Sequence, residues 1–149
     1  ELLEATLGFI GPALSPSRID WRTKEIAILR TSALLSCRYC IDSHTPVALD
    51  SGLTHAEVRA LRGEVDIHES FPGDTDRTLI NWIDAVAAGR GPIDATIADI
   101  AKSTFTDATI VELTLLVGAT MLLNRYATAL GLPVSAQTVN RLADEGFGR

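Results

Sequence analysis

Cys37 and Cys40 are the only two cysteines of the chain, separated by two residues, and His44 follows four residues later. On a helix that turns about 100° per residue, positions 37, 40 and 44 lie within about 60° of one another. Two thiols and an imidazole on one face are the smallest set of groups that reversible dithiol–disulfide chemistry requires. Ser36 is expected to cap a helix that begins here, and a helix N-terminus favours thiolate over thiol. These residues indicate a redox site.

Other interpretations of the two cysteines remain open. They could be buried core thiols, because free cysteine packs as a small hydrophobic residue. They could bind zinc, but a structural site needs four ligands and the chain adds only His44, His55 and His68. A thioredoxin-like module would need a βαβ context, which the sequence pattern lacks. His44 alone is also compatible with a structural histidine, and Glu25 with a carboxylate that stabilises the first turn of a helix.

The overall composition is that of an ordinary globular domain. The chain has 149 residues, of which 46% are hydrophobic and 21% are charged, and its net charge is −6. This length suits one core, so we expect a single domain over residues 1–149. The negative charge argues against a nucleic-acid-binding surface. Two cysteines cannot build the multi-bridge framework of a small secreted domain, so we expect a reducing, cytoplasmic environment.

No segment is expected to target the chain to a membrane or to cross one. The first residues include Glu1 and Glu4 instead of the basic run of a signal peptide. The longest apolar stretch, 110–123, contains Glu112 and is too short to span a bilayer. Because this stretch is apolar on nearly all sides, we expect other parts of the protein to cover it on most sides. Part of that cover is expected to come from another subunit.

The hydrophobic pattern is helical nearly throughout, and strand signals are weak. We predict an all-α fold of about seven or eight helices, with the Cys-x-x-Cys at the N-terminus of one of them. Gly11-Pro12 is expected to end the first helix, and Thr54 with Glu57 matches a capping box. Counting their caps, the expected helices cover residues 2–10, 20–35, 37–51, 54–63, 78–88, 93–102, 106–130 and 135–142, and residues 64–74 are expected to form a loop.

Four positions with reactive side chains stand at fixed spacing, which is more selective than the cysteine pair alone: Glu25, then Cys37 after eleven residues, Cys40 and His44. With the segments 25–30 and 52–57, this pattern resembles the carboxymuconolactone decarboxylase superfamily, and within it the alkylhydroperoxidase D-like branch. A weaker likeness continues over residues 116–132, where Asn124-Arg125 resembles the late helix of that family. The resemblance implies an all-helical, cofactor-free protein that forms trimers or hexamers.

The resemblance also implies a role for each of these residues. Cys40 would be the peroxidatic cysteine, which attacks a hydroperoxide to give a sulfenic acid, and Cys37 would resolve it by forming the Cys37–Cys40 disulfide. His44 and Glu25 would form the proton relay that deprotonates Cys40. The implied partners are a hydroperoxide and a cellular dithiol electron donor. The chain departs from the family pattern at Tyr39, where well-studied members have a second histidine between the cysteines.

A thiol peroxidase, an oxidoreductase that acts on peroxide as acceptor, is therefore the expected function. One alternative is a lyase that decarboxylates a small lactone acid, as the superfamily name implies. Such a lyase would need cationic groups in its pocket and would have no use for a dithiol. Another alternative is a non-catalytic redox sensor, whose disulfide changes packing and not a substrate.

The distance between Glu25 and the cysteines poses a geometric problem. If one straight helix ran from Glu25 to Cys37, a rise of 1.5 Å per residue would separate the two by about 18 Å. Glu25 can act on the site only if the chain bends in between, or if it reaches the site from another helix or subunit. Thr31-Ser32 and Ser36 are the places where the sequence would allow a bend.

Overall fold

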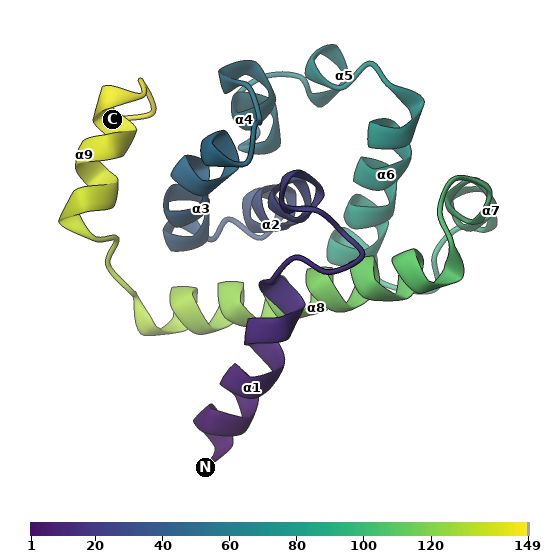
Figure 1. Cartoon of the computed structure of the whole chain (residues 1–149), viewed down its shortest axis with the longest axis horizontal. Helices are drawn as coiled ribbons and strands as arrows, with labels where there is room; N and C mark the ends of the chain where they lie inside the picture. The colour runs from purple at the N-terminus through teal and green to yellow at the C-terminus, as the bar shows by residue number, and fades with distance from the viewer. Residues whose placement is uncertain (149) are drawn as a thin grey trace.

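The computed structural model describes residues 1–148, and within them the chain is all-helical, with no strand. This confirms the predicted fold class, and the helices pack as a single domain (Figure 1). The helices are α1 (Leu2–Leu14), α2 (Trp21–Leu34), α3 (Arg38–Asp50), α4 (His55–Leu61), α5 (Ile67–Ser70), α6 (Asp74–Ala88), α7 (Ala95–Thr104), α8 (Asp107–Leu130) and α9 (Ala136–Asp144).

Eight of these helices match the predicted ones with shifted ends, and α5 is the one that the sequence pattern missed. It lies in the segment 64–74, which was expected to be a loop. A single turn of four residues is too short to leave an apolar periodicity in the sequence. The one local sequence feature that indicates α5 is its N-cap, Asp66. The carboxylate of Asp66 accepts a hydrogen bond from the backbone N–H of His68 at 2.8 Å.

The predicted end of α1 at Gly11-Pro12 is wrong, because the helix continues to Leu14. Proline removes one backbone hydrogen bond, but close to the end of a helix this loss affects only the last turn. That turn is closed by the N–H and the hydroxyl of Ser15, which both donate to the carbonyl oxygen of Gly11. In Figure 1, α1 extends away from the other helices, with the N-terminus at its free end.

The helix α2 forms the centre of the fold. Figure 1 shows it nearly end-on, with α3, α6 and α8 around it, and it packs against all three. Ile26, Ala27 and Leu29 have no exposed surface, and neither have the charged residues Lys24 and Glu25. Burying a charge is costly unless it is paired, so each of these two side chains needs a partner inside the fold.

Ion pairs tie α2 to its neighbours. The ammonium of Lys24 donates to the carbonyl oxygen of Ala13 at 2.9 Å and lies 3.4 Å from Glu112 of α8. Hydrogen bonds from Ser17 and from Lys24 hold the pKa of Glu112 below its usual range. These contacts connect the end of α1, the first turn of α2 and the start of α8.

The turn between α2 and α3 folds the chain back on itself. Ser36 adopts the left-handed conformation, with φ of +55°, and is exposed. Ser36 was expected to be the helix cap, but Cys37 takes that position, because a cap needs an extended backbone and Ser36 is used for the reversal. The N–H of Cys37 donates to the carbonyl oxygen of Ser32 at 2.9 Å. As a result, α3 packs along α2 instead of continuing it.

The helix α8 is longer than the apolar stretch 110–123 from which it was predicted. By length and composition alone it could cross a membrane, a test that the core helix of a globular protein also passes. One side of α8 packs against α1, α2, α3 and α6. Apolar side chains on its other side are about half exposed, namely Val111, Leu115, Leu122 and Tyr126. Gly131, in the left-handed conformation, ends the helix.

Candidate functional site

The two cysteines lie at the N-terminus of α3, as predicted, and form a disulfide in the structure. Their Cα atoms are 5.4 Å apart, an ordinary distance for a disulfide. Cys37 is the N-cap, and its sulfur accepts a hydrogen bond from the N–H of Cys40 at 3.4 Å. Both sulfurs therefore lie in the first turn, where the helix dipole favours negative charge. The fold thus suits a thiolate in the reduced form and a disulfide in the oxidised form.

The two cysteines differ in their access to the surroundings. Cys37 is completely buried, whereas Cys40 is 7% exposed. Cys40 also lines a pocket of about 280 Å³, and Cys37 is absent from its lining. A small molecule in this pocket would therefore meet Cys40 and not Cys37. This asymmetry agrees with the order of roles that the family resemblance implies.

Glu25 and His44 form a pair beside the cysteines. Nδ1 of His44 lies 3.0 Å from Oε2 and 3.3 Å from Oε1 of Glu25. The Glu25 side chain is 1% exposed, while His44 is about half-buried. Because a carboxylate only accepts hydrogen bonds, Nδ1 of His44 must carry the hydrogen. When the ring is neutral, Nε2 is then left with a free lone pair and can take up a proton.

The reversal at Ser36 removes the geometric problem that the sequence posed for Glu25. The straight-helix separation of about 18 Å does not apply, because α3 returns along α2 and brings His44 next to Glu25. The structure thus brings together, within one chain, all four residues that were singled out from the sequence. Cys40 and His44 are four residues apart on α3 and therefore share a face of that helix.

The pocket at Cys40 is mostly apolar and has a few polar groups. Its lining consists of Leu14, Ile28, Ser32, Tyr39, Cys40, Ser43, His44, Thr120, Leu123, Asn124, Tyr126, Ala127 and Leu132. No lysine or arginine is among them. Tyr39, the residue between the two cysteines that departs from the family pattern, also lines this pocket.

Sequence reasoning missed two polar residues of the pocket, Ser32 and Asn124, as members of the site. The hydroxyl of Ser32 donates to Oδ1 of Asn124 at 3.1 Å, and both residues are buried. The available signal was a single amide directly after the apolar stretch 110–123 of α8. A buried polar group in such a helix usually has a specific partner or task.

A metal site has little support in the part of the chain that the structure describes. Among residues 1–148, no three side chains of His, Cys, Asp or Glu are grouped as metal ligands would be. His55 lies 3.0 Å from Glu145 and stacks on the ring of Phe147. His68 lies in the short helix α5. The zinc interpretation of the cysteines therefore lacks the further ligands that it would need.

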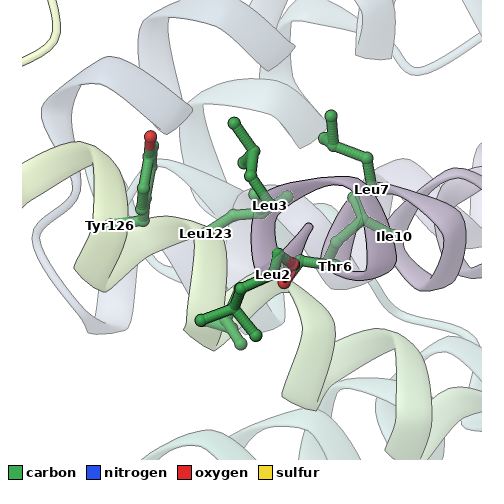
Figure 2. Close-up of a pocket in the computed structure, with 8 residues that line it drawn as sticks. Leu2, Leu3, Thr6, Leu7, Ile10, Leu123 and Tyr126 are labelled. Carbon is green, nitrogen blue, oxygen red and sulfur yellow. Dashed lines mark hydrogen bonds between the residues drawn. The ribbon is translucent and has the colours of Figure 1, made fainter.

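A larger apolar groove lies next to the site, between α1 and α8. Figure 2 shows its lining, in which Leu2, Leu3 and Leu7 come from α1, and Leu123 and Tyr126 come from α8. The groove has a volume of about 510 Å³, and none of the described residues that line it is charged. Leu123 and Tyr126 also line the pocket at Cys40, so the two hollows adjoin.

Solved structures share the architecture of this chain. One is a protein of unknown function from Agrobacterium tumefaciens, proposed to be the antioxidant defence protein AhpD. It has a TM-score of 0.79 at 22% identity, over 91% of this chain and 92% of that one. Another is a cysteine-to-alanine variant of the debrominase Bmp8, in complex with 2,3,4-tribromopyrrole. It has a TM-score of 0.74 at 15% identity, over 95% of this chain and 74% of that one. At these identities the likeness shows the shared fold.

The fold and the site define an all-helical protein with a Cys-x-x-Cys pair beside a buried glutamate–histidine pair. No protein of curated function matches the chain significantly. Residues 1–74 match the model of the carboxymuconolactone decarboxylase family, and Glu25, both cysteines and His44 all lie within them. The part of the chain that carries the site thus belongs to the carboxymuconolactone decarboxylase family, which confirms the resemblance to that superfamily.

Proposed function

We propose that the protein is a cofactor-free thiol peroxidase, which reduces hydroperoxides through a dithiol–disulfide cycle of Cys37 and Cys40. The observation that carries this proposal is the contact of 3.0 Å between Glu25 and His44, one helical turn from the cysteine that lines the pocket. A carboxylate, an imidazole and a thiol in this order are the parts of a proton relay that generates a thiolate. We also propose a cytoplasmic location, where dithiol donors are abundant.

In the first step, Nε2 of His44 takes the proton of the Cys40 thiol, and Glu25 stabilises the imidazolium that forms. The Cys40 thiolate then attacks the terminal oxygen of the hydroperoxide. A sulfur–oxygen bond forms while the oxygen–oxygen bond breaks, so that Cys40 becomes a sulfenic acid and an alkoxide leaves. The alkoxide takes the proton back from His44 and departs as an alcohol.

In the second step, the sulfur of Cys37 attacks the sulfur of the Cys40 sulfenic acid. The disulfide forms, and the hydroxide that leaves takes the Cys37 proton and becomes water. A cellular dithiol then reduces the disulfide by thiol–disulfide exchange and is itself oxidised. The position of Cys37 behind Cys40, out of the pocket, suits a residue that reacts with the sulfenic acid and not with the substrate.

The lyase alternative has less support from the pocket. Decarboxylation of a lactone acid would call for cationic side chains to bind the carboxylate, and among the described residues that line the pocket at Cys40 there is no lysine or arginine. The redox-sensor alternative uses the same two cysteines, so only kinetics can separate it from a peroxidase. A redox sensor is oxidised once and stays oxidised, whereas an enzyme consumes hydroperoxide in repeated cycles.

Steady-state kinetics test the proposed function. The reduced protein is mixed with tert-butyl hydroperoxide and dithiothreitol, and hydroperoxide consumption is followed. We expect many turnovers per chain, at a rate on the order of 10²-fold or more above that of dithiothreitol alone, the scale of general acid–base catalysis. Without dithiothreitol, one equivalent should be consumed. A rate no higher than that of free dithiothreitol would rule the peroxidase out, and release of CO₂ from a lactone acid would favour the lyase.

We further propose that the chain forms a homo-oligomer, a trimer or hexamer, in which a second copy covers the groove between α1 and α8. Leu2, Leu3 and Leu7 project from a helix that stands away from the other helices (Figures 1 and 2), and they are 82%, 57% and 56% exposed. The exposed apolar stripe of α8 borders the same groove. A continuous apolar surface of this kind marks an interface more often than free surface.

Sedimentation measurements test the oligomer. The unchanged protein is expected to sediment with the mass of three or six chains. Leu122→Glu, which puts a charge into the groove, should shift it to the mass of one chain, because an unpaired buried charge opposes association. Val65→Glu is the control, since Val65 is an equally exposed apolar residue away from the groove, and it should leave the mass unchanged. A monomeric unchanged protein would contradict the proposal.

A further inference from the structure

The amide of Asn124 is a buried donor at the pocket that the proposed reaction steps have not used. Asn124 lies on α8, is 1% exposed and lines the pocket together with Cys40 and His44. Its Oδ1 accepts the hydrogen bond from Ser32, whereas its Nδ2 has no hydrogen-bond partner among residues 1–148, which the structure describes. Folded proteins rarely leave a buried N–H group unpaired, so such a group calls for an explanation.

Ser32 fixes the orientation of this amide. Because the Ser32 hydroxyl occupies Oδ1, the two hydrogens of Nδ2 remain for another acceptor. The backbone carbonyl of Ser32 also accepts the N–H of Cys37 at 2.9 Å. One residue thus holds both the cysteine turn and the amide of Asn124. Their relative position is therefore set by a rigid part of α2 and not by a loop.

We propose that Nδ2 of Asn124 donates a hydrogen bond to the leaving oxygen of the hydroperoxide, which makes Asn124 a catalytic residue of the Cys40 reaction. The inference rests on the proposed function. As the oxygen–oxygen bond breaks, negative charge develops on the alkoxide oxygen, and a preorganised N–H donor stabilises such charge. The amide gives up no proton, so the alkoxide still receives its proton from His44. The acceptor that Nδ2 lacks is then the substrate itself.

The leaving group of the substrate gives the sharpest test. tert-Butyl hydroperoxide releases a strongly basic alkoxide, whereas peracetic acid releases acetate, which needs little stabilisation. In Asn124→Leu, which keeps the size of the side chain but removes the donor, we expect kcat/KM to fall about 10- to 100-fold for tert-butyl hydroperoxide. For peracetic acid we expect a loss of less than about threefold, because little charge has to be stabilised on acetate. A merely structural role of Asn124 would lower both values by the same factor.

Ser32→Ala provides the second variant and keeps the test decisive if Asn124→Leu does not fold. It leaves the amide in place but removes the bond that orients it, so we expect a smaller loss, about three- to tenfold, again larger for tert-butyl hydroperoxide. Equal losses for both substrates, or no loss in either variant, would overturn the inference. If the protein without substitutions did not turn over hydroperoxide, the proposed function itself would be refuted. That result is measured on the protein without substitutions alone, so it is distinct from a failure of the inference about Asn124.

Discussion

Cys40→Ser is expected to abolish hydroperoxide turnover, with a loss on the order of 10³-fold or more, as for other catalytic nucleophiles. A serine hydroxyl is not ionised near neutral pH and does not attack peroxide oxygen. Cys37 cannot take over, because it is completely buried and lies outside the pocket lining. The measurement is hydroperoxide consumption in the presence of dithiothreitol, with the melting temperature of the variant as the check on folding.

Cys37→Ser is the matched control and should fail at a different step. In this variant Cys40 still reacts once with hydroperoxide, but the sulfenic acid finds no resolving thiol. We expect one equivalent of rapid consumption and trapping of the sulfenic acid by dimedone, followed by slow turnover. If Cys40→Ser formed a trappable sulfenic acid and Cys37→Ser did not, the two roles would be reversed. If both variants kept the full rate, the cysteines would be structural.

The sequence predicted the fold well where local signals decide the structure. Thr54 and Glu57 form the predicted capping box, and Gly131 ends the longest helix. These features depend on residues within one turn of each other, and so does the apolar periodicity of the helices. The prediction was wrong at Pro12, because a proline close to a helix end costs too little to stop the helix there.

The candidate site could be predicted only in part, because its geometry depends on tertiary packing. The residue types and their spacing pointed to a redox pair with a possible relay. The contact between Glu25 and His44, however, follows from the left-handed conformation of Ser36, which a serine seldom adopts. The sequence offered Ser36 as one of the places for a bend, but it did not predict this conformation. The contact between Ser32 and Asn124 joins residues that are 92 positions apart in the chain. A single sequence carries no signal for such a contact.

Glu25→Gln is expected to lower kcat/KM for hydroperoxide about 10²-fold near neutral pH, the usual scale for loss of general acid–base assistance. Glutamine keeps the shape of the side chain and an oxygen that accepts from His44. What it removes is the negative charge that stabilises the imidazolium when His44 takes the proton of Cys40. At higher pH, where thiols ionise to solvent without help, the relay matters less. The defect should therefore be large near neutral pH and shrink as the pH rises.

Two comparisons decide whether Glu25 acts through His44 or only holds α2 and α3 together. In the first, kcat/KM is measured across the pH range for Glu25→Gln and for the control Glu57→Gln. Glu57 is also paired, to Arg22 at 2.6 Å, but lies outside the site, so its loss should lower the melting temperature and leave the pH profile unchanged. In the second, Glu25→Gln is combined with His44→Gln. Because the two residues would act as one relay, the double variant should be hardly slower than His44→Gln alone. If the losses in kcat/KM were additive, or if the defect of Glu25→Gln did not change with pH, Glu25 would have only a structural role.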